Sequence, residues 1–218
     1  MITIFGEGRG FRVVWLLEEM GLPYRLRPVD LLADLDQDTE FLAINPAGFI
    51  PALRDGDVTM VESIAIMEYL IARYGPTPLA PEPHDPAFPV YQQFLHLGEA
   101  GLAASIYFVG GARNIAPEAE RENWSARQAL SVFESRLSLV TRQLVRTPYL
   151  AGDAFTAADI SVYYALALAR GFGGVTLGET ERAYMSRISE RDAYKRAMET
   201  CQATQQAWGV AAAKSGDG

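Results

Sequence analysis

Glu62 and Ser63 precede a segment, Ile64 to Tyr74, whose apolar residues recur at helical spacing. A helix N-terminus carries unpaired backbone N–H groups and a partial positive charge, so it attracts a carboxylate. Ser63 stands where such a helix would begin, so a ligand carboxylate could bind there. The same two residues could equally do no more than cap the helix and complement its dipole.

Three glycines, Gly6, Gly8 and Gly10, alternate along the loop that follows the first β-prone run. A GxGxG loop after a strand could indicate dinucleotide binding. The fingerprint needs a further glycine, and Val13 stands in its place. The match is therefore weak, and we do not expect a dinucleotide site.

The remaining candidates for chemistry are few. His84 and His96 stand apart and lack metal-ligand spacing, so we expect no metal. Cys201 is the single cysteine of the sequence, which excludes an internal disulfide and CxxC redox chemistry. It lies too far along the chain from the other candidates to be given a role.

The 218-residue chain has 19 basic and 27 acidic residues and a net charge of −8. Nucleic-acid affinity depends mainly on Lys and Arg contacts to phosphate, so this balance argues against nucleic acid and against an anionic membrane surface. Residues 1–20 lack the apolar core of a signal peptide. The apolar run 162–169 is far shorter than the roughly 20 residues that span a bilayer. We therefore expect a cytoplasmic protein.

The elements that hold these residues are predicted from hydrophobic periodicity and from the positions of Gly and Pro. In the first third of the chain we predict strands at 2–5 and 24–29, helices at 11–20, 38–43 and 64–74, and a hairpin of 52–54 and 58–60 around the turn 55–57. The order is βαβ, then α, then ββα. It implies one parallel strand pair and an added antiparallel hairpin, hence a mixed sheet.

A proline-rich segment separates this part from a helical second part, because proline fixes φ and removes a backbone donor. We predict long helices at about 87–113 and 117–145, and a further helix that begins near Thr156. Thr156 and Asp159 have the spacing of a capping box, with Phe155 and Ile160 as its hydrophobic staple, which is a structural signal and not a catalytic one. The expected organisation is a domain at 1–75, a linker at 76–86, a helical domain at 87–210 and a flexible tail at 211–218.

Several stretches together resemble the glutathione transferase family. They are Arg9 to Glu19, Asn45 to Leu53 and Val61 to Ile66, and the capping box at Thr156 is similar to one in the helical domain of that family. The matches lie in both parts of the chain and in the order of the family. The resemblance implies a thioredoxin-like N-terminal domain (α/β, βαβ-α-ββα) that binds glutathione, followed by an all-α helical-bundle C-terminal domain.

The resemblance implies a glutathione-binding site made by Phe49, Ile50, Pro51, Glu62 and Ser63. Ser63 would hold the γ-glutamyl carboxylate and Glu62 the γ-glutamyl ammonium group. Pro51 would be cis, although only about 5–6% of X–Pro bonds are, so that the N–H and C=O of Ile50 pair with the cysteinyl backbone. Many relatives carry Lys or Gln at the place of Phe49 and can thereby help to hold the glycyl carboxylate. Phe49 cannot, and would pack at a subunit interface or narrow the site.

Members of the family lower the pKa of the glutathione thiol with a Tyr, Ser or Cys near the end of the first strand. This chain has none there: Phe5 takes the place of tyrosine, and the Ser-Arg-Ser-Phe-Arg of many Ser-type relatives corresponds to Gly8 to Arg12. Our hypothesis is that Arg9 and the Gly10 amide replace the hydroxyl, because a thiol pKa falls near helix N-termini and arginines. The alternative is that Arg9 is a solvated side chain. The charge of Glu7, which is close by in sequence, would repel a thiolate.

By the same resemblance, Tyr107, Phe108 and Arg113 would line a second-substrate pocket between the domains, although aromatic residues at such spacing are often simple core. The resemblance implies a homodimer that conjugates glutathione to a hydrophobic electrophile by thiolate attack. Two alternatives stay open. One is a glutathione-dependent isomerase or reductive dehalogenase with the same thiol site. The other is a non-catalytic glutathione-binding or protein-interaction member, which the loss of the Tyr, Ser or Cys position favours.

Overall fold

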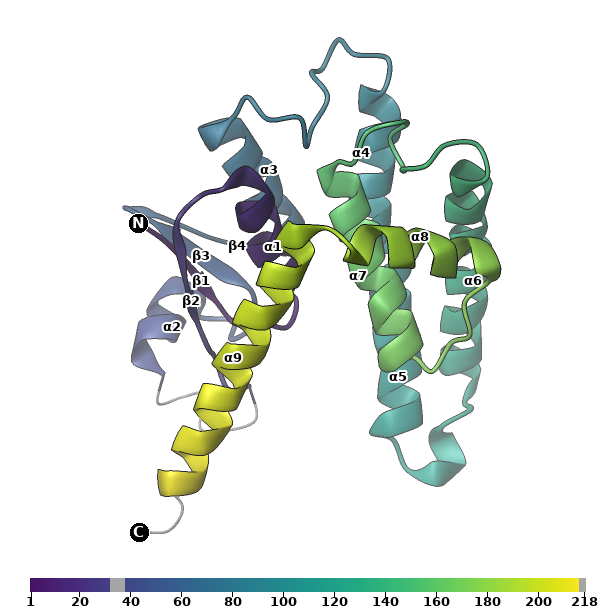
Figure 1. Ribbon diagram of the computed structural model, residues 1–218. Coiled ribbons are helices and arrows are strands. Elements are labelled where there is room, and N and C mark those ends of the chain that lie inside the picture. The colour runs from purple at the N-terminus through teal and green to yellow at the C-terminus, as the bar shows by residue number, and fades with distance from the viewer. Residues whose placement is uncertain (32–37, 216–218) are drawn as a thin grey trace. The chain divides into compact units, whose positions relative to one another are not determined.

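The computed structural model describes residues 1–31 and 38–215, with side chains described up to residue 204. The chain divides into two compact units. The first contains residues 1–75 together with the segment from residue 189 onward, and the second contains residues 76–188. Figure 1 labels the strands and the α-helices of both units.

The first unit is built around a four-stranded sheet in the order β2-β1-β3-β4. β1 and β2 pair in parallel, whereas β3 pairs antiparallel with both β1 and β4, which confirms the expected mixed sheet. β2 ends before Pro28, earlier than predicted, because a proline has no N–H to donate to a neighbouring strand. The elements are β1 (Ile2–Phe5), α1 (Phe11–Met20), β2 (Tyr24–Arg27), α2 (Thr39–Ile44), β3 (Ala52–Asp55), β4 (Val58–Val61) and α3 (Ser63–Tyr74).

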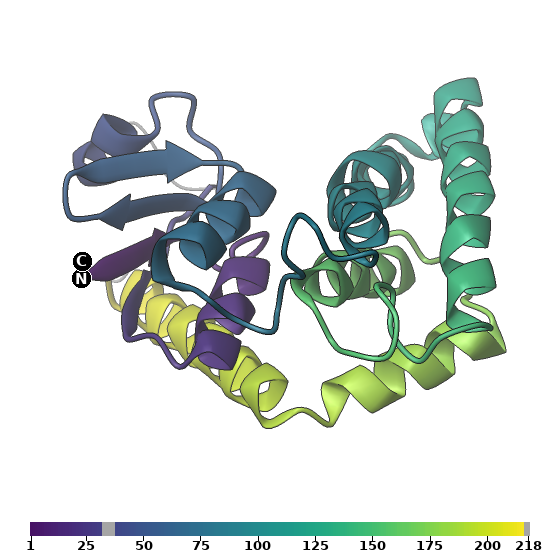
Figure 2. The ribbon, with the colours of Figure 1, turned by 90° about the horizontal axis from the view of Figure 1, so that it is seen from above.

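Alternating side chains give the sheet two buried faces. Phe5 and Ala52 lie opposite each other and pack in one cluster with Phe41 of α2. Ile4 and Leu53, the next aligned pair, point to the other face and are fully buried as well. Figure 2 shows α2 on one side of the sheet and α1 and α3 on the other.

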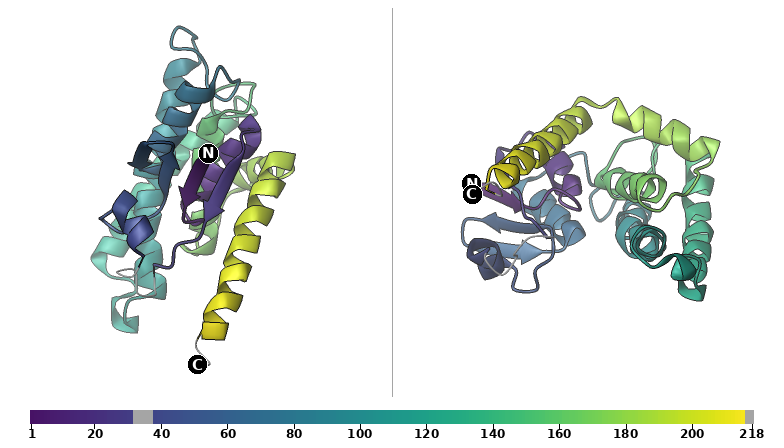
Figure 3. Two further views of the ribbon diagram at one scale, coloured as in Figure 1. Left: turned by 90° about the vertical axis from the view of Figure 1, so that its left-hand side faces the viewer. Right: turned by 90° about the horizontal axis from the view of Figure 1, so that it is seen from below.

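The C-terminal helix α9 (Asp192–Ser215) belongs to the first unit, where it packs on α1 and β2 (Figure 3). Arg191 holds both carboxylate oxygens of Glu19 at 2.7 Å, and Arg196 contacts Glu18 at 2.7 Å. The helical domain expected at 87–210 includes most of α9, because that expectation depends on periodicity alone. The helical backbone also continues to residue 215, beyond the expected start of the tail at 211.

The second unit is helical throughout its regular elements. They are α4 (Phe88–His96), the π-helix η2 (Leu97–Ala103), α5 (Ala104–Asn114), the short 3₁₀-helix η3 (Glu118–Glu120), α6 (Trp124–Leu144), α7 (Ala157–Gly171) and α8 (Glu179–Ser189). The predicted helix at 87–113 is thus continuous, with a π-helical turn inside it. The predicted start at Pro117 is wrong for the next long helix, because Asn123 caps α6 by accepting from the Ala126 N–H at 2.9 Å.

The π-helical turn lies where this long helix meets α7. A methyl group on Gly98 would lie 2.2 Å from the Ser161 hydroxyl oxygen, so only glycine permits this approach. The Ser161 hydroxyl donates to the Leu95 carbonyl at 2.7 Å. It thereby satisfies a backbone acceptor in the turn that leads into the π-helix.

The capping box of α7 is confirmed in full. Asp159 is completely buried and accepts hydrogen bonds from the N–H groups of Thr156 and Leu150 at 2.8 and 2.9 Å. The Tyr184 hydroxyl of α8 also donates to it at 2.9 Å. Burial raises the pKa of Asp159. The carboxylate therefore ties α7, the preceding loop and α8 together, and its role is structural.

Candidate functional site

The antiparallel ladders bring three candidate segments to one edge of the sheet. The last residue of β1 and the last residue of β4 both lie opposite Ala52, the first residue of β3. One position further along each strand are Gly6 after β1, Pro51 before β3 and Glu62 after β4. The loop after β1, the loop before β3 and the start of α3 therefore begin side by side.

The segment before β3 contains the cis peptide bond Ile50–Pro51, which confirms the expected isomer. Pro51 is buried and Ile50 is half-buried. Neither the N–H nor the C=O of Ile50 makes a hydrogen bond with another described residue. This short stretch of backbone can therefore pair with an extended peptide in the manner of an added strand.

Asn45, which the sequence analysis did not single out, fixes this segment. It is buried, with an exposed fraction of 3%. Its side-chain amide nitrogen donates to the Phe49 carbonyl at 2.5 Å, and its side-chain oxygen accepts from the Ala47 N–H at 3.1 Å. An Asn before Pro is typical of a turn, but the sequence does not say which carbonyl the side chain reaches.

The loop between β1 and α1 packs closely against Ile50. Gly6 has φ +82°, and a methyl group on it would lie 2.3 Å from Ile50 Cγ2. A methyl group on Gly10 would lie 2.0 Å from the Gly6 carbonyl oxygen. On Gly8 it would meet the end of the Ile50 side chain at 3.2 Å and nothing else nearby. Two of the three glycines are thus required by close approaches, whereas Gly8 is not.

The loop also presents backbone donors. The Phe11 N–H is engaged with the Glu7 carbonyl at 2.5 Å. Among the described residues, the N–H groups of Gly8 and Gly10 have no acceptor. The Arg9 side chain is half-buried. An anion next to this loop would thus meet two backbone donors and a guanidinium group on the same short segment.

At the start of α3, Ser63 is buried and Glu62 is exposed. Glu62 has φ 71°, a conformation that non-glycine residues rarely adopt and that tends to occur at functional sites. No side chain caps this helix end, and the Ser63 hydroxyl bonds to no other described residue. The first helical N–H groups are therefore open to an anionic ligand.

Phe5 and Phe49, the two phenylalanines that the sequence analysis singled out, have different surroundings. Phe5 is fully buried in the cluster beneath α2, where its ring stacks on Phe41 at 6.2 Å. Phe49 is half-buried in the loop that Asn45 fixes. A polar group that replaced Phe5 would thus need a partner on the α2 side of the sheet.

Glu7 is buried within the loop between β1 and α1. One of its carboxylate oxygens, Oε2, has no hydrogen-bond partner among the described residues. Burial raises the pKa of Cys201 to about 12, and the charge of Glu7 adds to this effect. Cys201 therefore stays a neutral thiol near neutral pH and is a poor nucleophile in the folded protein.

The three residues expected to line a second-substrate pocket lie on α5. Tyr107 shares a hydrogen bond with the Tyr164 hydroxyl at 2.9 Å, and Arg113 donates to the Gly173 carbonyl at 2.7 Å. Both therefore also tie α5 to α7 and to the segment that follows it. Phe108 is 70% exposed and contributes little to the core of its own unit.

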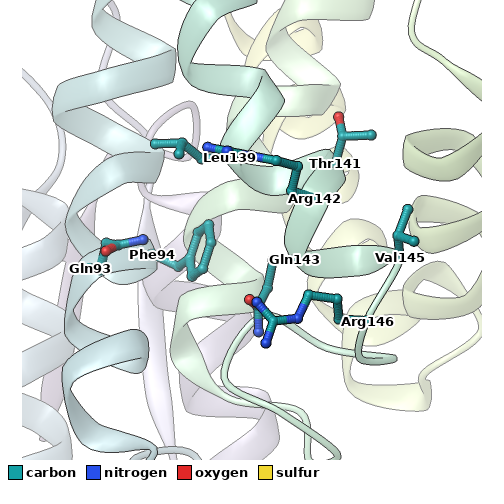
Figure 4. A pocket seen from close by; sticks show the side chains of 8 residues that line it. All are labelled: Gln93, Phe94, Leu139, Thr141, Arg142, Gln143, Val145 and Arg146. Carbon is teal, nitrogen blue, oxygen red and sulfur yellow. The ribbon is translucent and has the colours of Figure 1, made fainter.

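A separate cavity of about 440 Å³ lies between α4 and the C-terminal half of α6, and Figure 4 shows its side chains around the Phe94 ring. None of the site residues predicted in the sequence analysis lines this cavity. The lining residues are Gln93, Phe94, Leu139, Thr141, Arg142, Gln143, Val145 and Arg146.

Within residues 1–31 and 38–215, no group of three or more His, Cys, Asp or Glu side chains is arranged to hold a metal ion. In the same part of the chain, no helix is both long and apolar enough to cross a membrane.

A mixed four-stranded sheet with a cis-proline before β3, together with a separate all-helical unit, defines a thioredoxin-like domain joined to a helical domain. The comparisons with known proteins agree with this class. Residues 10–73 match the family Glutathione S-transferase, N-terminal domain, and residues 65–192 match Glutathione S-transferase, C-terminal domain. The chain therefore belongs to the glutathione S-transferase family of enzymes.

Individual relatives cover most of the chain. Glutathione S-transferase 3 of Zea mays is 35% identical over 158 residues, which are 68% of this chain and 68% of the relative. Glutathione S-transferase 3 of Schizosaccharomyces pombe is 28% identical over 207 residues, 88% of this chain and 84% of the relative. The glutathione-bound theta class glutathione S-transferase of Xanthomonas axonopodis pv. citri has a TM-score of 0.76 and 27% identity over 90% of this chain and 96% of its own.

Proposed function

We propose that the protein is a glutathione transferase that conjugates reduced glutathione to a hydrophobic electrophile. The glutathione thiolate attacks an electrophilic carbon, a carbon–sulfur bond forms, and the leaving group departs with the bonding electrons. The protein would hold glutathione in place and lower the pKa of its thiol. Residues 1–75, with α9 packed on them, would form the glutathione-binding domain, and the helical part of the predicted range 87–210 that lies in the second unit, up to residue 188, would supply the helical domain.

The observation that carries this proposal is the backbone of Ile50 next to the cis bond at Pro51, since its N–H and C=O bond to no other residue that the structure describes. Glutathione is a short peptide, and its cysteinyl N–H and C=O match an acceptor and a donor on one residue of the protein. Phe49 would lie beside the glycyl end of the ligand. Its ring offers no charge to the glycyl carboxylate, so we expect the affinity to come mainly from the other end of the peptide.

The start of α3 supports the placement of that other end. The γ-glutamyl group carries a carboxylate and an ammonium group. Ser63 and the open N–H groups behind it would bind the carboxylate, and the exposed carboxylate of Glu62 would bind the ammonium group. Pro51 precedes β3 and Glu62 follows β4, and the strand residues next to them, Ala52 and Val61, are paired. One ligand could therefore reach both segments.

The thiol would lie near the loop after β1, since this loop packs on Ile50. We propose that the Gly10 N–H and Arg9 stabilise the thiolate in place of the missing hydroxyl. An Arg9→Ala variant should then react more slowly at neutral pH and regain much of the difference at alkaline pH, where the thiol ionises without help. Equal rates at both pH values would contradict the role of Arg9.

For the electrophile, we propose an apolar compound that contacts the α5 residues Tyr107, Phe108 and Arg113. We also propose that the protein is a cytoplasmic homodimer without membrane or nucleic-acid partners, in keeping with its net charge of −8. Sedimentation equilibrium tests the oligomeric state directly.

The decisive experiment is a calorimetric titration of the full chain with reduced glutathione, on the wild type and on Ser63→Ala. Loss of the hydroxyl contact to a charged carboxylate should weaken binding roughly tenfold or more. Ser138→Ala, an exposed serine of α6, is the matched control and should bind like the wild type. Saturable binding that Ser63→Ala leaves unchanged would contradict the placement of the γ-glutamyl carboxylate at the start of α3.

A second candidate is a non-catalytic glutathione-binding or interaction protein, favoured by the absence of a hydroxyl or thiol at Gly8 and Gly10. It predicts saturable binding of glutathione without any change in the pKa of its thiol. A glutathione-dependent isomerase or reductive dehalogenase would share the lowered pKa, and substrate assays would separate it from a conjugating enzyme.

A further inference from the structure

Asn45 is a buried polar residue of the candidate site, and its side-chain hydrogen bonds go to backbone groups. Asn45 spans the turn that precedes β3, with one contact to the Ala47 N–H and one to the Phe49 carbonyl. Its own backbone N–H is engaged with the Phe41 carbonyl at 2.8 Å, so the residue is anchored to the end of α2. The turn also contains Gly48, with φ +69°, which has no side chain to limit its motion.

The contact to Phe49 determines the direction of the next N–H group. The cis bond is the one between Ile50 and Pro51, and the peptide bond before it, between Phe49 and Ile50, is trans. In a trans peptide the C=O and the N–H point in opposite directions. Since the Phe49 carbonyl points toward Asn45, the Ile50 N–H must point away from it and out of the turn.

We propose that Asn45 is a positioning residue for glutathione: it orients the Ile50 N–H, and with it the backbone that would pair with the cysteinyl residue. This inference rests on the proposed function. Without the Asn45 amide the Phe49 carbonyl loses its donor, and the peptide plane can rotate. Glutathione would then have to order the turn when it binds, which weakens binding even where the fold is intact.

Two substitutions separate the two contacts of the side chain. Asn45→Asp keeps the shape and the acceptor for the Ala47 N–H, but it places a carboxylate oxygen against the Phe49 carbonyl. Asn45→Ala removes both contacts. The matched control is Asn114→Asp on α5, because the Asn114 side chain also donates to backbone carbonyls, those of Gly110 and Phe172, at 2.8 and 2.7 Å.

Each variant is titrated with reduced glutathione by calorimetry at neutral pH, well below its own melting temperature, and its melting temperature is measured in parallel. We expect Asn45→Asp and Asn45→Ala to bind glutathione about tenfold more weakly. Asn114→Asp should melt earlier and bind like the wild type. The affinity is the discriminating readout, since a merely structural residue changes the melting temperature alone.

A backbone NMR titration of the wild type tests the proposal even where the variants do not fold. The Ile50 amide should shift on addition of glutathione, and its hydrogen exchange should slow. Wild-type-like affinity in both Asn45 variants, an equal loss in Asn114→Asp, or an Ile50 amide that glutathione leaves unchanged would each overturn the role of Asn45. A wild type that does not bind glutathione would overturn the proposed function, and this inference with it.

Discussion

Gly8 is the one glycine of the loop after β1 at which a side chain could be introduced with only a small shift of the end of a neighbouring side chain. A methyl group there approaches only the flexible end of Ile50, at 3.2 Å, whereas on Gly10 it would lie 2.0 Å from the Gly6 carbonyl oxygen. Ile50 is also the residue whose backbone is proposed to pair with the cysteinyl part of glutathione. A Gly8→Ser variant should therefore place a hydroxyl group beside the bound thiol and lower its pKa.

The size of the effect follows from one hydrogen bond. A hydrogen bond to a charged group contributes about 2 kcal/mol, which corresponds to a pKa lower by about 1.5 units. For a site in which Arg9 and the Gly10 N–H leave the thiol pKa at its free value of about 8.5, the thiolate fraction at pH 7 rises from about 3% to about 50%, and any lowering that they already provide makes this gain smaller. A thiolate of lower pKa is also less nucleophilic, by about fivefold for this shift at a Brønsted coefficient of about 0.45. The net gain in rate at pH 7 is therefore only about threefold.

The higher thiolate fraction and the lower nucleophilicity oppose each other, and together they change the pH–rate profile in a way that a structural change would not. Above pH 9 the thiol is ionised in both proteins, so the variant should be slower than the wild type by about fivefold. The two pH–rate profiles should cross near pH 8, as the same shift in pKa requires. The assay is single-turnover conjugation of an activated aryl halide at saturating glutathione, with the thiolate absorbance of the bound ligand titrated in parallel.

The Gly10→Ser variant is the control for this reasoning. Its side chain would collide with backbone, so it should lose stability by about 1–3 kcal/mol and gain no activity at neutral pH. A Gly8→Ser protein that folds and binds glutathione, with both the thiol pKa and the rate profile unchanged, would refute the placement of the thiol. It would mean that position 8 faces away from the ligand.

Two further predictions concern buried groups outside the site. Asp159→Ala should lower the free energy of unfolding by about 3–5 kcal/mol. The reason is that the N–H groups of Leu150 and Thr156 and the Tyr184 hydroxyl lose a shared acceptor in the interior. Chemical denaturation measures this loss, and a value below about 1 kcal/mol would contradict the structural role of Asp159. Cys201 has a folded-state pKa of about 12, against about 8.5 for an unfolded thiol, so the folded state retains a proton that the unfolded state releases. Its contribution to stability should be complete below about pH 8.5 and should decline by about 1.4 kcal/mol per pH unit above it. Cys201→Ala should flatten this decline, and thiol reagents should label the wild type only as it unfolds.

Much of the fold could be predicted because local signals and tertiary packing agree. The hairpin around Gly56 follows from its Asp-Gly turn, and the start of α7 follows from the capping box of Thr156 and Asp159. The cis isomer at Pro51 could be predicted only from the resemblance to the family, since the residues themselves favour trans.

Other features depend on contacts between distant parts of the chain, which periodicity does not report. α9 resembles the helices before it in pattern, and its place on α1 and β2 depends on pairs such as Arg191 with Glu19, 172 positions apart. The boundary at Pro117 was wrong for a local reason. A proline suits a first helical turn, but Asn123 offers a side-chain acceptor, and the long helix begins there instead.

The three alternating glycines that could indicate a dinucleotide site have a steric explanation. Gly6 makes room for Ile50, and Gly10 makes room for the Gly6 carbonyl, so both are fixed by the same tight turn. A serine at position 10 therefore requires a different course of the loop, and the second serine of the Ser-type pattern could not be kept on this backbone. No such constraint applies at Gly8. The loss of a hydroxyl there is a change in chemistry that the fold did not require, and for that reason the backbone amides of this loop are the first place to look for what replaced it.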